Sequence, residues 1–295
     1  MVSVVIPVFN DTRRLLKAIR ALSNQTYPKN RYEIIVIDNG SEIDVRPFLN
    51  SFEQIVFSRE KQAGAFPARN RGISLSKGDI IAFTDSDCIP NHDWIERGVE
   101  SFLGADNCGL VAGRIDVFYI DPEHPTAIEL YDHLMALPQR NFLEKERYGA
   151  TANLFVPRTV FRELGLFNAM HKSEGGDAEL GYRTSKAGLI QLFCDKAVVK
   201  HPARNTLTAI IKKGLRTTIG TQVTIEKYNY KGRSFLQYVI HHLFQRPREL
   251  NVKMSVSPFC AGWRMRLKVI SLYYLIKSLQ VVERLRVKLA GDTIR

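Results

Sequence analysis

The stretch GDIIAFTDSDC, residues 78–88, places two carboxylates directly after a short apolar run. The run holds β-branched and aromatic residues and lies between Gly78 and Pro90, so it predicts a buried β-strand. Ligands of open α/β sheets bind beyond the carboxyl ends of the strands. Asp85 and Asp87 stand at that position, and we expect them at a ligand site.

Two carboxylates separated by one residue repel each other unless a cation or a proton lies between them. A hard divalent cation such as Mg²⁺ or Mn²⁺, shared with a phosphate group, is the partner that this chemistry favours. The pair by itself leaves a structural alternative open, in which Asp85 caps a turn and Asp87 is solvated. The rest of the sequence favours the ligand site.

The positive charge of the chain is concentrated in its last third. The 295 residues, 45% hydrophobic and 24% charged, have a formal net charge of +12. Residues 201–295 hold 18 Lys and Arg against 4 Asp and Glu, whereas residues 1–200 hold 24 against 26. We therefore predict two regions with different partners, residues 1–203 and residues 204–295.

Cysteine spacing and hydropathy indicate a cytoplasmic protein. The four cysteines, Cys88, Cys108, Cys194 and Cys260, are widely spaced, and none of them forms the Cys-x-x-Cys pair typical of zinc or redox sites. A reducing compartment is the simplest interpretation. Residues 2–9 are too short an apolar run for a signal peptide and lack a basic leader. No uncharged run approaches the roughly 20 residues of a membrane span, and the apolar residues 269–276 are bounded by Lys268 and Lys277.

Strand and helix patterns alternate through the first two-thirds of the chain. Strands are predicted at residues 2–9, 33–38, 54–57, 80–84, 109–117, 153–156, 189–194 and 197–201. Helices are predicted after residue 11 and at residues 66–75, 94–102, 158–164 and 177–187. This alternation predicts an α/β fold with a doubly wound, mostly parallel sheet.

Five stretches, in order and at similar spacing, resemble the family-2 glycosyltransferases with the GT-A fold. They are VVIPVFN (residues 4–10), EIIVIDNGS (33–41), GAFPARNRGI (64–73), FTDSD (83–87) and GDAELGYR (176–183). The resemblance covers roughly the first two-thirds of the chain. It implies a nucleotide-sugar-binding domain and transfer of a hexose, and it does not specify the sugar.

The resemblance implies a site for the base of the donor at the first two strands. Asp38 would accept a hydrogen bond from the base, and the backbone of Pro7, Val8 and Phe9 would line it. The sequence Asp-Asn-Gly at residues 38–40 is also favourable turn chemistry, so a turn residue is the alternative for Asp38.

The resemblance also implies which residues bind diphosphate and metal. Arg69 would pair with the diphosphate, while Arg71 fits a solvated helix face equally well. Asp85 and Asp87 would hold the donor and a Mn²⁺ or Mg²⁺ ion, with Asp87 as the direct ligand and the ion acting as a Lewis acid. His201 lies where many relatives carry a histidine near the metal, and a purely structural histidine is the alternative.

Asp177 matches the catalytic carboxylate of the family, which is usually preceded by Glu, whereas here Gly176 precedes it. The implied role is to take the proton of the acceptor hydroxyl as that oxygen attacks the anomeric carbon with inversion. Glu174 is the substitute if Asp177 is only an N-cap. Glu179 and Arg183 are spaced for a simple helix ion pair.

Other functions fit less well. A glycosidase would need two carboxylates facing one glycosidic bond, and the resemblance of the first strand would go unexplained. A sugar nucleotidyltransferase shares the fold class, but its glycine-rich first loop is absent. A non-catalytic GT-A-like module, binding nucleotide as a membrane-associated scaffold, stays open because the Gly176–Asp177 pair departs from the family pattern.

The basic residues 204–295 predict amphipathic helices, with apolar segments beginning at Leu207, Phe235 and Trp263. Such helices suit an anionic membrane surface; packing on the catalytic domain or on a second subunit is the alternative. No motif supports nucleic-acid binding. We expect transfer from a UDP-sugar to a glycan or lipid-linked acceptor in cell-surface polysaccharide or glycolipid synthesis, in the cytoplasm at the inner face of the cell membrane.

Overall fold

The chain forms two compact units. The computed structural model describes residues 1–52, 55–136, 139–171, 175–228 and 247–289. The first unit consists of Met1–Asp116 and Leu137–His201, and the second of Val117–Ala136 and Pro202–Arg295. Residues 117–136 thus belong with the basic region, whereas the sequence analysis placed them in the first region. The apolar segment that starts at Phe235 lies outside the described residues.

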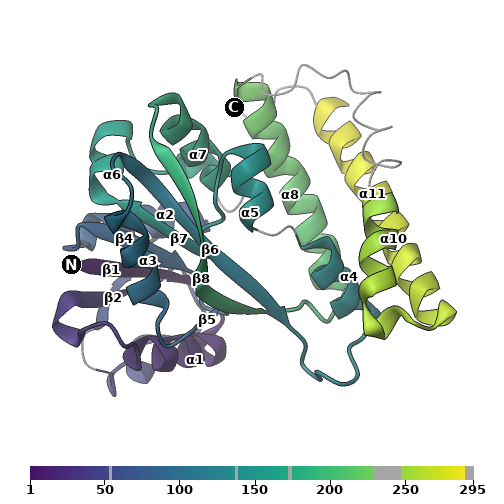
Figure 1. Ribbon diagram of the computed structural model, residues 1–295, viewed down its shortest axis with the longest axis horizontal. Coiled ribbons are helices and arrows are strands. Elements are labelled where there is room, and N and C mark those ends of the chain that lie inside the picture. Colours follow the sequence, from purple (N-terminus) through teal and green to yellow (C-terminus); the bar gives the residue numbers. More distant parts are fainter. Residues whose placement is uncertain (53–54, 137–138, 172–174, 229–246, 290–295) are drawn as a thin grey trace. The chain divides into compact units, whose positions relative to one another are not determined.

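The first unit is built on an eight-stranded sheet of order β3-β2-β1-β4-β7-β6-β8-β5 (Figure 1). The strands are β1 (Val2–Val8), β2 (Tyr32–Asp38), β3 (Ile55–Arg59), β4 (Ile80–Thr84), β5 (Ile89–Pro90), β6 (Cys108–Phe118), β7 (Asn153–Pro157) and β8 (Ile190–Pro202). Strand β1 pairs in parallel with β2 and β4, and β2 with β3. Strand β7 pairs antiparallel with β4 and β6, and β5 with β8. The predicted α/β fold is confirmed.

Helices cover both faces of this sheet because alternate residues of the buried strands point to opposite sides. Their bounds are α1 (Thr12–Ser23), α2 (Ala65–Leu75), α3 (Trp94–Leu103), α5 (Gln139–Asn141), α6 (Arg158–Leu164) and α7 (Gly176–Lys186). Val4 and Ile6 of β1 belong to a core with Leu15 of α1. Val5, between them in sequence, lies with Phe66 of α2 in the core of the other face.

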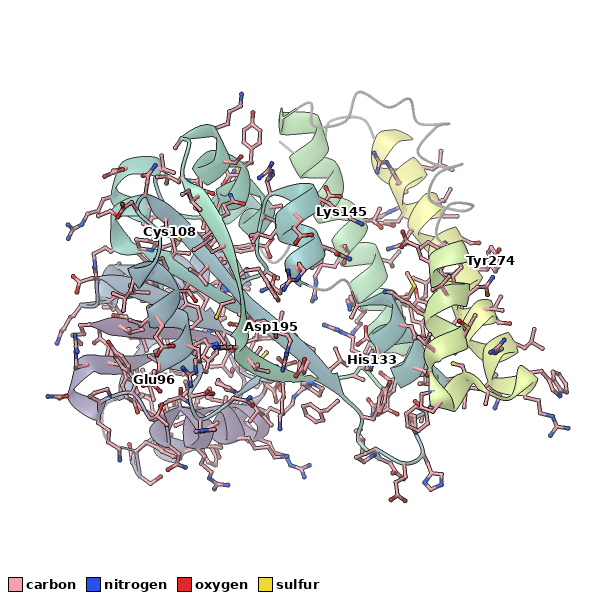
Figure 2. All side chains as sticks on the ribbon, viewed as in Figure 1. Glu96, Cys108, His133, Lys145, Asp195 and Tyr274 are labelled. Atoms are coloured by element: carbon pink, nitrogen blue, oxygen red, sulfur yellow. The ribbon has the colours of Figure 1, made fainter. Side chains whose placement is uncertain are left out.

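Strand β8 corrects one prediction. The sequence suggested two strands, residues 189–194 and 197–201, separated by the polar pair Asp195-Lys196, but Ile190–Pro202 is one continuous strand. The pair is exposed within the ladder; Asp195 is labelled in Figure 2. The carboxylate of Asp195 accepts a hydrogen bond of 3.1 Å from Arg114 on β6. A polar dipeptide without glycine or proline therefore did not end the strand.

The packing of α3 on β7 gives a stability test. Replacing Gly98 by alanine should lower the free energy of unfolding by about 1–3 kcal/mol, because the added Cβ would lie 2.2 Å from Cζ of Phe155. That ring is fully buried and packs against Trp94, at 4.8 Å between centroids. Urea unfolding measures the change.

The control for Gly98→Ala is Gly104→Ala. Gly104 follows α3, has an ordinary negative φ of −101°, and a Cβ there would meet nothing within 4 Å. We expect this variant to match or slightly exceed the wild type in stability, because alanine restricts the unfolded chain. Equal stability of the two variants would contradict the packing argument.

The second unit is helical, as predicted for the C-terminal extension. Its main helices are α4 (Ala127–Met135), α8 (Leu207–Tyr228), α10 (Pro247–Val256) and α11 (Trp263–Leu289), and they share one apolar core. Buried Asp132 of α4 accepts hydrogen bonds from Lys213 (2.8 Å) and Arg204. Burial by itself would raise the pKa of Asp132, but these two cations bring it below its ordinary value.

None of the described helices combines sufficient length with a sufficiently apolar window to cross a membrane.

Candidate functional site

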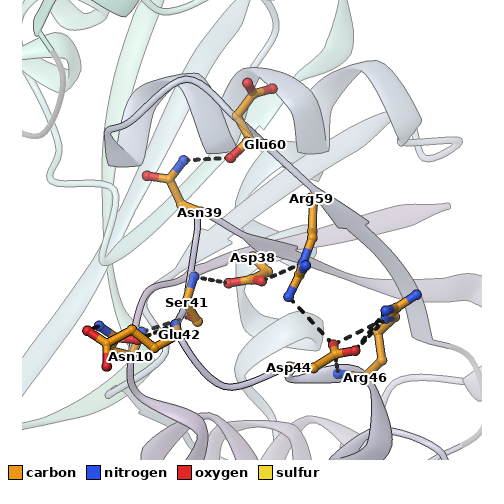
Figure 3. Close-up of polar contacts among 9 residues, drawn as sticks. All are labelled: Asn10, Asp38, Asn39, Ser41, Glu42, Asp44, Arg46, Arg59 and Glu60. Atoms are coloured by element: carbon orange, nitrogen blue, oxygen red, sulfur yellow. Dashed lines mark hydrogen bonds and ion pairs between the residues drawn. The ribbon is translucent and has the colours of Figure 1, made fainter.

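The candidate site lies at the edge of the sheet where the parallel strands β1, β2 and β4 end. Strand β2 ends at Asp38, whose side chain is fully buried. One carboxylate oxygen accepts the backbone N–H of Ser41 at 2.9 Å, and the other accepts Nε–H of Arg59 at 2.9 Å (Figure 3). The carboxylate is thus held from two sides.

Arg59 is a site residue that the sequence analysis missed. It is the register partner of Asp38 in the parallel ladder of β2 and β3, and about half of its side chain is exposed. A second acid, the partly exposed Asp44, lies 3.7 Å from Nη2 of Arg59. The sequence could have indicated Arg59, because neighbouring parallel strands end at the same edge of the sheet, and Arg59 ends β3 where Asp38 ends β2.

The loops that follow β1 and β2 are tied together. The backbone N–H of Asn10 donates to Oγ of Ser41, and Oδ1 of Asn10 accepts the N–H of Glu42, both at 2.9 Å. Asn10 has a left-handed φ of 51°, which asparagine tolerates better than most residues. Just before it, the side chain of Phe9 is 62% exposed. The segment predicted to line a base therefore presents an open aromatic ring near the end of β1.

Asp85 follows β4 and is paired with a buried cation. Nη2 of Arg69 donates to Oδ1 of Asp85 at 2.6 Å, and the guanidinium lies 5.1 Å from the ring centre of Phe66 on the same helix. The buried Nε of Arg69 has no hydrogen-bond partner among the described residues. Arg71, whose side chain is exposed, instead donates from Nε to Oγ of Ser58 on β3.

Asp87 lies between a histidine and an arginine from distant parts of the chain. Its Oδ1 is 3.8 Å from Nε2 of His201, and its Oδ2 is 3.7 Å from Nη1 of Arg14. Arg14 also donates from Nε to Asp11 at 2.7 Å. The antiparallel pairing of β5 with β8 brings His201 here, because it places Ile89 opposite its neighbour in β8.

The residues around Asp87 fit a divalent metal ion. Ligand atoms of Asp87, Cys88 and His201 all lie within 4.8 Å of one another. Burial, with the charges of Asp85 and Asp87, raises the pKa of the Cys88 thiol well above its ordinary value. We therefore assign the ion to the carboxylate and the imidazole rather than to this thiol. A carboxylate with an imidazole remains, a donor set that suits Mn²⁺.

Asp177 lies in the first turn of α7, where its Oδ1 accepts the backbone N–H of Ala178 at 2.9 Å. The helix is capped by Gly175, which has a left-handed φ of 87°, so Asp177 is inside the helix and is not its N-cap. The substitute Glu174 lies outside the described residues.

Two further features of α7 have structural reasons. A Cβ at Gly176 would lie 2.8 Å from the ring of Phe66, so the close packing of α7 on α2 explains why glycine replaces the usual glutamate. The predicted pair of Glu179 and Arg183 forms at 2.8 Å. Arg183 also donates to backbone carbonyls that follow α6, so this pair ties α7 to α6.

A comparison with protein families shows which family the chain belongs to. A family model described as glycosyl transferase family 2 matches residues 3–165. The chain belongs to this family. The match covers the strand ends that carry Asp38, Asp85 and Asp87, whereas Asp177 and His201 lie beyond it.

Curated family 2 relatives agree with this membership. The chain is 36% identical over 224 residues to glycosyltransferase AglE of Haloferax volcanii, which spans 74% of this chain and 72% of that protein. It is 31% identical over 218 residues to the pre-mycofactocin glycosyltransferase of Mycobacterium tuberculosis, spanning 70% of this chain and 43% of that protein.

Solved structures agree on the GT-A fold of this family 2 glycosyltransferase. The mannosyltransferase PcManGT from Pyrobaculum calidifontis, in complex with GDP-Man and Mn²⁺, has a TM-score of 0.63 at 15% identity, covering 99% of this chain and 87% of that one. GalNAc-T7 with UDP, GalNAc and Mn²⁺ has a TM-score of 0.56 at 19% identity, covering 69% and 43%. At such identities the likeness concerns the fold alone.

Proposed function

We propose that this family 2 glycosyltransferase moves a hexose from a nucleotide-sugar, a UDP-sugar by preference, to a hydroxyl of a glycan or lipid-linked acceptor, with inversion at the anomeric carbon. The observation that carries the proposal is the meeting of three carboxylates at one sheet edge. Asp38 ends β2, and Asp85 and Asp87 follow β4, which is separated from β2 by β1 alone. A base and a diphosphate are the two parts of one donor that such positions suit.

In this proposal Asp38 reads the base. An ionised carboxylate only accepts hydrogen bonds, and Ser41 and Arg59 hold this one in place. It therefore selects a base that presents an N–H at its pairing edge, as uracil does at N3, and disfavours cytosine, whose N3 is an acceptor. The exposed ring of Phe9 offers a surface against which such a base stacks.

Asp87, with Asp85 and His201, would hold a Mn²⁺ or Mg²⁺ ion, and the donor set favours Mn²⁺. When bound, the ion supplies positive charge that stabilises the leaving diphosphate. The chain's own part is to orient these ligands: Arg69 fixes Asp85 through its hydrogen bond of 2.6 Å. Arg14 adds a cation 3.7 Å from Asp87.

Asp177 would act as the general base. As the acceptor oxygen bonds to the anomeric carbon and the bond to diphosphate breaks, the hydroxyl proton passes to the carboxylate of Asp177. The alternative of a non-catalytic scaffold rested on Gly176, which stands where the family usually has glutamate. Because the ring of Phe66 leaves no space for a side chain at Gly176, this departure is explained by packing and does not argue against an enzyme.

The proposed base site is tested by thermal unfolding with UDP, GDP, dTDP and CMP, each with and without Mn²⁺. We expect UDP with Mn²⁺ to raise the melting temperature most, because a ligand that binds only the native state stabilises it by mass action. In Asp38→Asn the UDP affinity should fall about tenfold, since an amide presents a donor as well as an acceptor to the base.

The matched control is Asp44→Asn. Asp44 shares the neighbour Arg59 with Asp38, but it also pairs with Arg46, is partly exposed and lies in the following loop. This variant should respond to UDP like the wild type. If no nucleotide shifts the melting of the folded wild type, the proposed donor class is wrong. If Asp44→Asn loses as much affinity as Asp38→Asn, the loop rather than the carboxylate matters.

A further inference from the structure

Helix α11 has two different faces. One face is buried in the core of the second unit through Val269, Tyr273 and Ile276. Another side presents an apolar stripe that remains open to solvent. This α11 stripe consists of Trp263, Leu267, Tyr274 and Leu285, which are 69%, 56%, 43% and 37% exposed. Their separations of four, seven and eleven residues place them on one side of an α-helix, and Tyr274 is labelled in Figure 2.

The charges beside the α11 stripe have one sign. Arg264, Arg266 and Lys268 are exposed in the first turns of α11. Farther along, Arg286 is also exposed, and it forms an ion pair of 2.7 Å with Glu283, the only acidic residue of the helix. The stripe therefore lies on a strongly cationic helix.

We propose that the α11 stripe docks α11 on the surface of an anionic bilayer, with the helix in the plane of the membrane. An apolar face with tryptophan and tyrosine, surrounded by Lys and Arg, is what an interfacial helix requires. The cations would lie near the lipid phosphates, where the surface potential attracts them. This inference goes beyond the transfer reaction and does not depend on it.

Charge decides between a bilayer and a second copy of the chain. If the stripes of two copies packed together, the cations exposed along one helix, Arg264, Lys268 and Arg286, would lie close to the cations of the other. Like charges at an interface disfavour association. An anionic bilayer presents the opposite charge and covers the same apolar side chains.

The two tryptophans of the chain provide a direct probe. Trp94 is fully buried, so Trp263 is the one whose surroundings change when the stripe enters a membrane. With full-length protein and vesicles of phosphatidylcholine and phosphatidylglycerol, we expect a blue shift of the fluorescence and quenching by brominated lipid. In Trp263→Phe the vesicles should still bind the protein, but the blue shift should disappear.

Co-sedimentation with the same vesicles measures the contribution of the stripe. The double variant Leu267→Glu with Leu285→Glu should partition at least about tenfold more weakly, because it places two carboxylates on the buried side of the docked helix. Both positions are exposed, so folding should be kept, and circular dichroism checks this. The matched control is Leu103→Glu, on α3 of the first unit and 84% exposed, which should bind like the wild type.

Vesicles without phosphatidylglycerol, and high salt, should each reduce binding, because both remove the electrostatic attraction. The proposal is overturned if the double variant binds like the wild type, or if binding ignores both lipid charge and salt. It is also overturned if vesicles are not bound and sedimentation velocity shows a dimer that the double variant loses. That last result would assign the stripe to a second copy.

Discussion

Replacing Asp87 by alanine should lower kcat/KM for nucleotide release from the donor by about 10³-fold. Among the described residues at the sheet edge, Asp87 is the carboxylate whose oxygens lie near both a second ligand candidate, His201, and a cation, Arg14. Its loss removes one of the two carboxylates proposed to hold the ion and leaves Asp85 with the imidazole of His201. The measurement is UDP release from the UDP-sugar that best stabilises the wild type, with Mn²⁺ present.

Two comparisons make the Asp87→Ala result specific. In Asp116→Ala a partly exposed carboxylate is removed from β6, where it pairs with Arg114, and activity should stay near that of the wild type. Paramagnetic-resonance titration of Mn²⁺ in the presence of UDP should show weaker ion binding in Asp87→Ala alone. If Asp87→Ala keeps both activity and ion affinity, the ion is not held at this position.

The part of the fold that depends on local pattern was predictable from the sequence. The alternation of buried side chains in β1 follows from period two, and the apolar face of α1 follows from a period of 3.6 residues. The general rule that parallel strands end at one edge was enough to place Asp38, Asp85 and Asp87 near a common site. These predictions need no knowledge of distant contacts.

Local sequence pattern does not reveal which residues distant segments bring together at the site. Arg59 acquires its place beside Asp38 only through the register of β3 on β2. The family resemblance alone suggested His201 near the metal; what brings it near Asp87 is that β8 runs unbroken past Asp195 and pairs with β5. Arg14 lies on the polar side of α1, where the sequence pattern gives no reason to distinguish it from its charged neighbours.

Residues 117–136 show the same limitation at the level of units. Their composition is ordinary, and the charge balance of the chain assigned them to the first region. The structure joins α4 to α8 and α11 through a shared core and through the buried carboxylate of Asp132, which accepts hydrogen bonds from Lys213 and Arg204. A buried acid whose two cations come from a segment far along the chain gives no local signal.

Replacing Asp177 by asparagine should lower kcat by about 10²–10⁴-fold while leaving the binding of UDP and Mn²⁺ close to that of the wild type. Asparagine has nearly the same shape, and its oxygen still accepts the N–H of Ala178 at the start of α7. It does not accept the proton of the acceptor hydroxyl. The donor-binding carboxylates Asp38 and Asp87 are unchanged, so the melting shift with UDP should persist.

The variant that discriminates for Asp177 is Glu174→Gln. If Asp177 is the base, Glu174→Gln should keep most of the wild-type kcat, and only Asp177→Asn should lose the acidic limb of the pH–rate profile that a titrating base produces. If the losses are reversed, the base is Glu174 and the glycine before Asp177 marks a shift of the catalytic carboxylate along the loop. If Asp87→Ala lowers kcat but neither Asp177→Asn nor Glu174→Gln does, neither carboxylate is the general base. The proton of the acceptor hydroxyl would then pass to water.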